Sequence, residues 1–312
     1  MTAARYRRTV LATCCVPWTD ADRFDEASFR GSIARLVAGG INDLYIFGTA
    51  GEGHAVATSD FERITRTFLS EAHAQGVSPM VGVVNVSIAT VVERITFAAG
   101  LGCSTFQISL PSWGTMTDRD VRAFFDTVCG QFPTLQFLHY NLARAGRILR
   151  AADYVPIAGD HPNLVATKYG GGDPELIAGL LLQVPMLRHF LTELGFYAAC
   201  PIGEPGLLAS VATSNAARTR QYYDAAVAGD LVRLASLHRE LAAMLVELRA
   251  CVGTEPRIDG TYDKIVAKVA EPDFPLHLLP PWESPTESSY RRYRDFLVAN
   301  FPAWVGEPDG RH

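Results

Sequence analysis

Residues 135–169 read LQFLHYNLARAGRILRAADYVPIAGDHPNLVATKY and contain the clearest alternation of strand and helix patterns in the chain. Leu135–Tyr140 and Leu164–Lys168 are short runs of apolar and β-forming residues, and Ala151–Ala158 between them has a helical pattern. Because parallel strands need a long crossover connection, a strand, a helix and a second strand predict a parallel βαβ unit. This stretch therefore predicts an α/β protein.

The same alternation continues on both sides of this unit. We expect eight strands, at Val10–Val16, Asp43–Phe47, Pro79–Val84, Thr105–Leu110, Leu135–Tyr140, Leu164–Lys168, Arg188–Leu191 and Leu207–Ala212. The helices expected between them include Glu26–Ala38, Ser59–Ala74, Ile88–Leu101, Asp118–Gly130, Ala151–Ala158, Pro174–Gln183 and Asn215–Ala228. Eight such repeats are the number in a closed (β/α)₈ TIM barrel, and a doubly wound open sheet is the alternative. We predict an α/β TIM barrel.

The length of 312 residues would by itself suggest about two domains. The strand pattern instead assigns residues 1–228 to one catalytic barrel and leaves residues 229–312 as a C-terminal helical extension. Leu231–Cys251 in that extension carries leucines at three- and four-residue spacing, which is typical of an amphipathic helix, and helical patterns at Tyr262–Ala270 and Ser288–Phe301 follow. We expect the extension to cover one end of the barrel or to form a subunit contact.

Composition and charge narrow the class of function. The formal net charge is −5, from 28 lysines and arginines against 33 aspartates and glutamates, so the chain is a poor candidate for nucleic-acid binding. No stretch reaches the ~18 continuous apolar residues of a membrane helix. The six cysteines form no CxxC pair, which predicts free thiols in a reducing compartment. We expect a cytoplasmic protein that acts on a small molecule.

A glycine-rich stretch, Gly48-Thr49-Ala50-Gly51-Glu52-Gly53, follows the second predicted strand. Glycines let the backbone approach a ligand closely, and successive backbone amides can bind a carboxylate or a phosphate. In a barrel this stretch lies at the carboxyl ends of the strands, where the active sites of this fold are found. It predicts an anion-binding turn, with a plain tight turn as the alternative.

Two side chains with reactive groups stand at the ends of the fifth and sixth predicted strands. Tyr140 has a phenol that can carry a proton, unless it is a core aromatic with a satisfied hydroxyl. Lys168 ends an apolar run, where burial would lower the pKa of its amine and leave a nucleophile able to form a Schiff base with a carbonyl. The alternative is a lysine that reaches solvent. His139, on the opposite strand face, is expected to be structural.

At these residues the chain resembles the dihydrodipicolinate synthase / N-acetylneuraminate lyase family of class I, Schiff-base-forming aldolases. Gly48–Glu52 is similar to the family's Gly-Thr-Thr-Gly-Glu or Gly-Ser-Thr-Gly-Glu motif, and Tyr140-Asn141 matches its tyrosine–asparagine pair. Lys168 stands at the position of its catalytic lysine. Ser210–Asn215 is similar to the family's segment after the eighth strand. The resemblance covers the predicted barrel and, more loosely, the helical extension.

The resemblance implies a homotetramer, with a dimer as the other possibility, that acts on pyruvate or another 2-keto acid without a metal or a cofactor. Lys168 would form the imine, Tyr140 would shuttle protons, and Thr49 would orient Tyr140 and help to relay the proton. The backbone amides around Thr49–Gly51 would bind the carboxylate of the keto acid. The residues expected to contact the substrate are Gly48, Ala50, Gly51, Trp113, Arg144 and Ser210.

Three positions depart from the family's pattern. Ala50 replaces the second threonine of the motif, which removes one hydroxyl contact to the carboxylate. Trp113 replaces a tyrosine that the synthases extend into a neighbouring subunit, and an indole donates a hydrogen bond but does not shuttle a proton as a phenol does. It would suit a less polar acceptor, or pack at a subunit interface. Ala145 stands where the synthases have an arginine for the aldehyde's carboxylate, with Arg144 and Arg147 nearby.

These observations predict an aldolase or lyase of the pyruvate type in which Lys168 forms the Schiff base. Two alternatives stay open. A hydro-lyase would remove water from a deoxy-keto-sugar acid through the same imine. A catalytically silent barrel would bind a keto acid as a sensor or scaffold without turnover.

Overall fold

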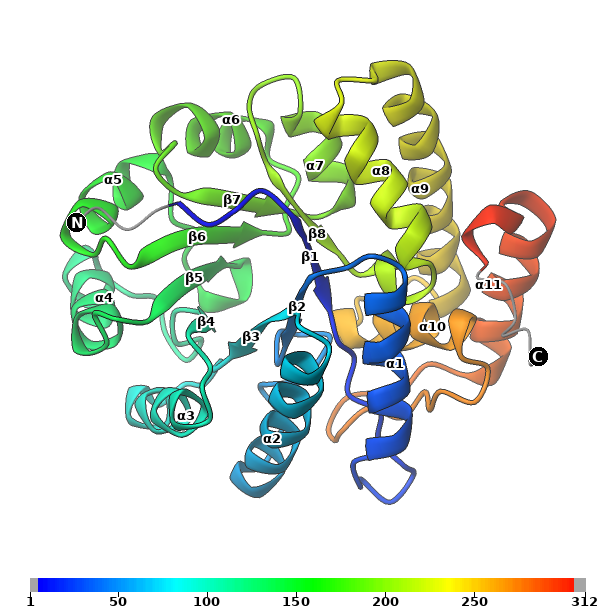
Figure 1. The fold of residues 1–312 in the computed structure, drawn as a ribbon, viewed down its shortest axis with the longest axis horizontal. Helices are drawn as coiled ribbons and strands as arrows, with labels where there is room; N and C mark the ends of the chain where they lie inside the picture. The colour runs from blue at the N-terminus through cyan, green and yellow to red at the C-terminus, as the bar shows by residue number, and fades with distance from the viewer. Residues whose placement is uncertain (1–4, 306–312) are drawn as a thin grey trace. The chain divides into compact units, whose positions relative to one another are not determined.

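The computed structural model describes residues 5–305 of the chain (Figure 1). Its eight strands form one closed barrel in chain order. They are β1 (Val10–Thr13), β2 (Asp43–Ile46), β3 (Ser78–Gly82), β4 (Thr105–Ile108), β5 (Gln136–Asn141), β6 (Leu164–Tyr169), β7 (Arg188–Leu191) and β8 (Gly206–Ala209). From β3 to β8 each strand pairs in parallel with the next. The predicted TIM barrel is confirmed, and the open doubly wound sheet is excluded.

Helices alternate with the strands. They are α1 (Glu26–Ala38), α2 (Thr58–Ala74), α3 (Ile88–Gly100), α4 (Asp118–Gln131), α5 (Ala151–Asp160), α6 (Pro174–Gln183), α7 (Glu193–Ala199) and α8 (Ala216–Val227), followed by α9 (Leu231–Val252), α10 (Asp259–Ala270) and α11 (Glu287–Asn300). Helix α7 has no counterpart among the predicted helices, because its 7 residues complete only about two turns and show little amphipathic repeat. The predicted eighth strand ends early, since the 3₁₀ turn η2 (Val211–Thr213) replaces its last residues.

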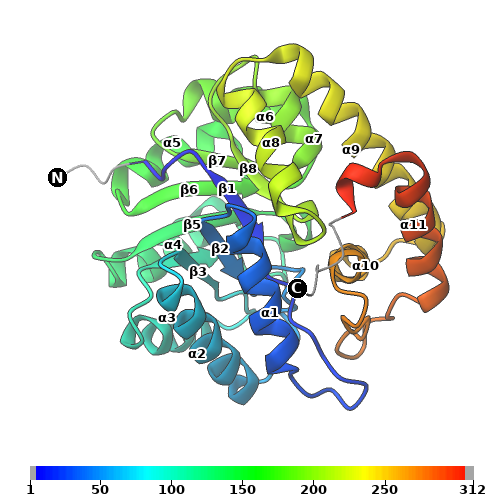
Figure 2. The ribbon, with the colours of Figure 1, turned by 45° about the vertical axis from the view of Figure 1, so that its right-hand side comes forward.

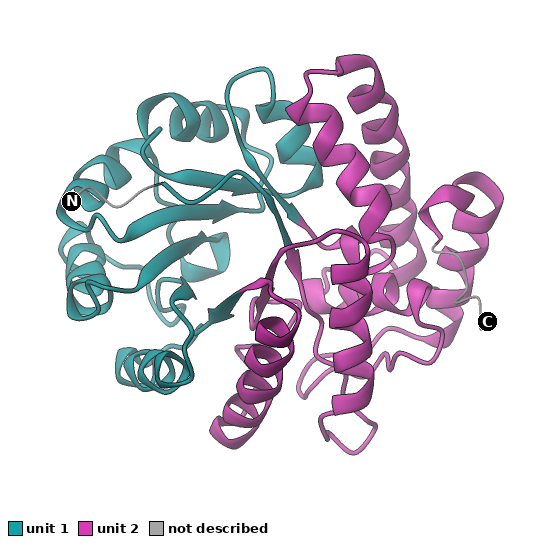
Figure 3. Cartoon of the chain, in the orientation of Figure 1, with its two compact units in different colours: residues 1–11, 79–208 teal, residues 12–78, 209–312 magenta. Residues whose placement is uncertain are grey.

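The chain divides into two compact units (Figure 3). One consists of residues 1–11 and 79–208, and we call it the lysine unit because it contains Lys168. The other consists of residues 12–78 and 209–312, and we call it the glycine-turn unit because it contains Gly48–Gly53. The boundary near residue 228 between barrel and extension stays a prediction.

In the lysine unit, the strands β4 to β7 pair in parallel in chain order, and the register between β5 and β6 shifts once, between Phe137 and Leu138. Tyr140 of β5 is paired with Lys168 of β6, and Gln107 of β4 is paired with Leu138 of β5. Side chains alternate between the two faces of a strand, so Leu138 and Tyr140 share one face of β5. Gln107 therefore lies at the level of Leu138, which is nearer to the amino ends of these strands than the level of Tyr140 and Lys168.

The opposite faces of these strands hold two buried imidazoles. His139 Nδ1 lies 2.6 Å from the hydroxyl of Tyr154 in α5. His189 Nδ1 lies 2.7 Å from the hydroxyl of Thr167, and its Nε2 lies 2.9 Å from the carbonyl oxygen of Val184. Burial lowers the pKa of His139 to about 3 and the pKa of His189 to about 4. His139 thus faces the helix layer and has a structural environment, as predicted.

These lowered pKa values predict that acid destabilises the fold. As the pH falls below 6.5, an unfolded chain gains a proton on each imidazole, whereas the folded chain gains them only near pH 3 to 4. We expect the free energy of unfolding to decrease over this range by about 1.4 kcal/mol per pH unit for each imidazole. Urea unfolding at several pH values should show that the free energy of unfolding of His139→Gln depends less steeply on pH, by the contribution of one imidazole. His73→Gln, at an exposed position of α2, should keep the wild-type slope; an unchanged slope in His139→Gln would contradict the account.

In the glycine-turn unit, α9 packs against α8 and α11, and α10 contacts α9 and α11 (Figure 2). The buried face of α9 consists of Leu234, Leu237, Leu241, Met244, Leu248 and Cys251, which confirms the helix that the leucine spacing predicts. The helices predicted near residues 262–270 and 288–301 are present as α10 and α11. All six cysteines of the chain are free. Between residues 5 and 305, no helix has the length and apolar character to cross a bilayer.

Candidate active site

Lys168 lies near the carboxyl end of β6 with only 3% of its surface exposed. Its Nζ donates a hydrogen bond to Gln107 Oε1 at 3.3 Å and lies 3.6 Å from the centroid of the Tyr140 ring. Tyr140 is itself buried, with 8% of its surface exposed. The amine is therefore enclosed by side chains of three neighbouring strands, and the alternative of a lysine that reaches solvent does not apply.

Gln107 is the member of this cluster that the sequence patterns did not single out. Its side chain is fully buried, and its Nε2 has no hydrogen-bond partner among the described residues. A polar side chain at a buried strand position is normally paired, because burying an unpaired amide is unfavourable. The glutamine within the apolar run Thr105–Leu110 was the signal that could have identified it.

Asn141 closes the loop that follows β5. Its Nδ2 donates to the carbonyl oxygen of Leu149 at 2.7 Å, and its Oδ1 accepts from the amide of Leu149 at 2.9 Å. The loop between them contains the 3₁₀ turn η1 (Ala143–Ala145), on which Arg144 is exposed and Ala145 is buried. The asparagine next to Tyr140 thus fixes the loop that carries Arg144.

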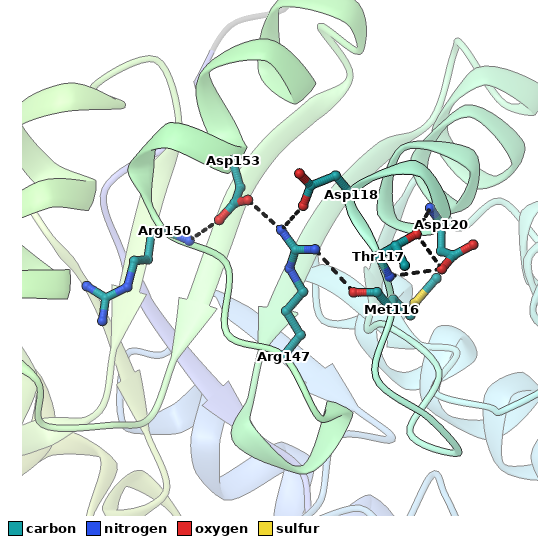
Figure 4. A network of polar contacts seen from close by, with 7 residues as sticks. All are labelled: Met116, Thr117, Asp118, Asp120, Arg147, Arg150 and Asp153. Carbon is teal, nitrogen blue, oxygen red and sulfur yellow. Dashed lines mark hydrogen bonds and ion pairs between the residues drawn. The ribbon is translucent and has the colours of Figure 1, made fainter.

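Arg147 is held by two acidic side chains (Figure 4). Its Nη2 lies 2.7 Å from Asp118 Oδ1 and 2.7 Å from Asp153 Oδ1, and its Nη1 donates to the carbonyl oxygen of Met116 at 3.1 Å. The hydrogen bonds with Asp118 and Asp153 raise the pKa of the guanidinium. Asp118 begins α4 and Asp153 lies in the first turn of α5, so Arg147 connects the amino-terminal turns of the two helices. Of the two arginines near the predicted acceptor site, Arg147 is therefore part of the scaffold.

Trp113 is 92% exposed on the segment between β4 and α4. An indole with this exposure contributes little to the packing of its own chain. Its predicted contact with substrate stays a prediction, and so does the contact predicted for Arg144.

The predicted anion-binding turn is tightly wound and lies in the glycine-turn unit. The amide of Gly53 donates to the carbonyl oxygen of Gly48 at 3.2 Å, and the amide of Glu52 donates to that of Thr49 at 3.1 Å. A Cβ on Gly51 would lie 2.6 Å from the backbone nitrogen of Phe47. One on Gly53 would lie 2.3 Å from the backbone oxygen of Phe47. Only glycine allows this close approach of two backbone segments.

Two backbone N–H groups of this turn are available to donate hydrogen bonds to a bound anion. Among the described residues, the backbone N–H groups of Ala50 and Gly51 donate no hydrogen bond within the protein, although both residues are buried. Buried amides without acceptors are unfavourable, and successive amides form a concavity that suits an anion. The side chain of Ala50 belongs to an apolar cluster with Cys15, Ala267 and Phe274, which suits a methyl group better than a hydroxyl.

A buried ion pair supports this turn. Glu52, which adopts a positive φ of 54°, is 1% exposed, and its Oε1 lies 3.0 Å from Nζ of Lys264 in α10. The same oxygen accepts from Trp18 Nε1 at 3.0 Å, and Oε2 accepts from the amide of Leu279 at 2.7 Å. Lys264 Nζ also donates to the carbonyl oxygen of Val16. Glu52 could be identified as part of a motif, but no sequence pattern pointed to Lys264 as its partner.

Two further predicted residues lie in the glycine-turn unit. Thr49 is buried, and Ser210 immediately precedes η2, where its carbonyl oxygen accepts from the hydroxyl of Thr213 at 2.8 Å. Their parts in proton relay and substrate binding stay predictions. Across residues 5–305, no group of three or more His, Cys, Asp or Glu side chains is placed to hold a metal ion.

Comparison with known proteins agrees with this architecture. The model of the dihydrodipicolinate synthetase family matches residues 7–255. The chain is 25% identical over 279 residues to the 4-hydroxy-tetrahydrodipicolinate synthase of Exiguobacterium sibiricum, covering 86% of this chain and 90% of that protein.

Two solved structures show the same fold. One is YagE, a prophage protein of the dihydrodipicolinic acid synthase family from E. coli K12 in complex with pyruvate, with a TM-score of 0.85 and 16% identity over 94% of this chain and 98% of that chain. The other is CdNal from Clostridium difficile in complex with mannosamine, with a TM-score of 0.84 and 14% identity over 95% of this chain and 100% of that chain. Because the family model matches most of the sequence, the chain belongs to the dihydrodipicolinate synthetase family, whose members are lyases and aldolases.

Proposed function

We propose that this protein is a class I lyase that forms a Schiff base between Lys168 and pyruvate or another 2-keto acid, and then makes or breaks a carbon–carbon bond. The observation that supports this most strongly is the buried amine of Lys168, 3.3 Å from Gln107 Oε1 and 3.6 Å from the Tyr140 ring centroid. A neutral amine is the nucleophilic form of a lysine, and a neighbouring phenol can exchange protons with it.

The proposed reaction begins when the neutral amine of Lys168 attacks C2 of the keto acid. A C–N bond forms, the C2 oxygen takes up a proton to give a carbinolamine, and loss of water leaves a protonated imine. Tyr140 passes the protons between nitrogen and oxygen. The imine withdraws electrons, so C3 loses a proton and the resulting enamine attacks an aldehyde. Water then hydrolyses the product imine and frees Lys168; in the reverse direction the same steps cleave a carbon–carbon bond.

We assign the carboxylate of the keto acid to the glycine-rich turn. The unpartnered amides of Ala50 and Gly51 provide two donors without a charged side chain, which suits a small anion. The roles predicted for Thr49 in the proton relay, and for Gly48 and Ser210 in substrate binding, belong to the same proposal.

The acceptor is proposed to be less polar than that of the synthases. Trp113 offers an exposed indole, Arg147 is engaged by Asp118 and Asp153, and the exposed Arg144 is proposed to bind a carboxylate on the acceptor. The similar structures YagE and CdNal are complexes with pyruvate and with mannosamine, which supports a keto acid as one partner and a small carbonyl compound as the other. We also propose a cytoplasmic homo-oligomer, a tetramer or a dimer, in which Trp113 serves a neighbouring subunit.

Trp113→Ala separates a functional role from a packing role. Because the side chain is 92% exposed, we expect the free energy of unfolding to change by less than about 0.5 kcal/mol. The KM for the aldehyde should rise, while the rate of imine formation with pyruvate should stay at the wild-type value. Steady-state kinetics and urea unfolding measure the two effects. An unchanged KM for every aldehyde that the protein accepts would remove Trp113 from the acceptor site.

An activity survey tests the proposed function. The purified chain is incubated with pyruvate and a panel of aldehydes that includes aspartate semialdehyde, aromatic aldehydes and sugars, and separately with deoxy-keto-sugar acids. We expect pyruvate consumption with at least one aldehyde, and none with Lys168→Arg. Turnover of a sugar acid without aldehyde would favour the hydro-lyase instead. Binding of keto acid without turnover in either arm would favour the silent binding protein.

A further inference from the structure

The environment of Gln107 points to a function beyond packing. Its side chain is fully buried, its Oε1 accepts a hydrogen bond from Lys168 Nζ at 3.3 Å, and its Nε2 has no hydrogen-bond partner among the described residues. Two N–H donors of one amide are thus available directly beside the reacting amine. A leucine or valine at this strand position would fill the interior without this unfavourable burial of a polar group.

The orientation of the amide follows from the chemistry of the lysine. An ammonium group has donors only, so it requires the acceptor oxygen of Gln107 and not its nitrogen. When the amine is neutral, an N–H bond that points at Oε1 directs the lone pair of Nζ away from Gln107. Gln107 therefore orients the nucleophile in the form that attacks a carbonyl.

The free end of the amide lies within reach of a molecule attached to Lys168. The oxygen and nitrogen of an amide are about 2.2 Å apart in one plane. With Oε1 at 3.3 Å from Nζ, Nε2 is close enough to donate to an oxygen on the carbon that Nζ attacks. Gln107 also lies nearer than Lys168 to the amino ends of the strands, because it is paired with Leu138 and Lys168 with Tyr140.

We propose that Gln107 is a further catalytic residue of the lysine site: its Oε1 orients the Lys168 amine, and its Nε2 donates to the C2 oxygen of the 2-keto acid while the C–N bond forms. This inference rests on the proposed function. Attack by the amine places negative charge on the C2 oxygen, and a fixed donor at that point stabilises the charge. A C2 oxygen directed down to Gln107 leaves C3 free to face the carboxyl ends of the strands, where an acceptor enters a barrel of this kind.

Two variants separate the functions of the amide. Gln107→Met keeps the length of the side chain and removes both polar atoms, whereas Gln107→Glu keeps an acceptor and removes the donor. We expect each to slow imine formation at saturating pyruvate by about 10²-fold, the effect of losing one such donor. The pyruvate concentration at half-maximal rate should stay close to the wild-type value, because the carboxylate is bound elsewhere. In Gln107→Glu the added carboxylate should also shift the pH profile of imine formation to higher pH, since it raises the pKa of the amine.

The experiment measures imine formation by quenching mixtures of protein and pyruvate with borohydride at timed intervals over a series of pH values. Gln136→Met, a half-buried glutamine at the start of β5, is the matched control and should react at the wild-type rate. If the wild type and both Gln107 variants form the adduct at the same rate and with the same pH profile, the role of Gln107 is overturned while the proposed function stands. If the wild type forms no adduct with pyruvate, the proposed function fails and this inference fails with it. Should Gln107→Met not fold, the rate and the pH profile of Gln107→Glu decide.

Discussion

Replacing Tyr140 by phenylalanine is expected to slow imine formation on Lys168 by about two to four orders of magnitude, the usual contribution of a positioned proton carrier. The substitution removes only the hydroxyl. The ring that lies 3.6 Å from Lys168 Nζ stays in place, so the amine keeps its environment and the fold is preserved. The loss therefore reports proton transfer and not packing. Timed borohydride quenching with pyruvate measures the rate.

A second tyrosine of the same unit supplies the control. Tyr154 is also buried, and its hydroxyl lies 2.6 Å from His139 Nδ1 in the helix layer instead of beside the lysine. Tyr154→Phe should lose some stability but form the imine at the wild-type rate. Equal rates in Tyr140→Phe and the wild type would remove Tyr140 from the relay, although Lys168 could still be the nucleophile.

The largest effect on stability is expected from Lys264→Met. Glu52 is 1% exposed and its Oε1 lies 3.0 Å from Lys264 Nζ, so the substitution leaves a buried carboxylate without its cation. Breaking a buried pair in this way costs about 3 to 5 kcal/mol of unfolding free energy. Urea unfolding at neutral pH measures the loss. Adding Glu52→Gln to Lys264→Met should recover part of it, since the amide removes the buried charge and its one oxygen can still accept one of the two hydrogen bonds from Trp18 and Leu279.

Lys268, one turn later on α10, is the matched control. Its Nζ lies 3.1 Å from Glu287 Oε1, but the side chain of Glu287 is 54% exposed and is solvated once the lysine is gone. Lys268→Met should therefore cost clearly less than Lys264→Met. Equal losses in the two variants, or no recovery in the double variant, would show that the Glu52–Lys264 pair does not stabilise the glycine-rich turn as described.

The fold was predictable because its signals are local. Most strands are short apolar runs followed by a longer amphipathic segment, and α1 and α6 begin and end at the predicted residues. Helix α7 was missed because 7 residues carry too little periodic pattern. Tyr140 and Lys168 could be proposed together because both stand near the carboxyl ends of their strands, and these ends lie at the same end of a barrel.

The remaining parts of the site depend on contacts that no local pattern encodes. The bond between Lys168 and Gln107 depends on the pairing of β4, β5 and β6 and on the length of the lysine side chain. Likewise, only the folded chain brings Lys264 of α10 to Glu52. The engagement of Arg147 by Asp118 and Asp153 likewise joins residues that no local sequence pattern connects.

A covalent adduct on Lys168 would show the proposed Schiff base directly. The protein is treated with borohydride in the presence of pyruvate, its intact mass is measured, and the modified peptide is mapped, with Lys168→Arg as the control. We expect one reduced pyruvyl group on Lys168 of the wild type and none on the variant. The absence of an adduct on Lys168 with pyruvate and with every other small 2-keto acid would contradict the proposed Schiff base.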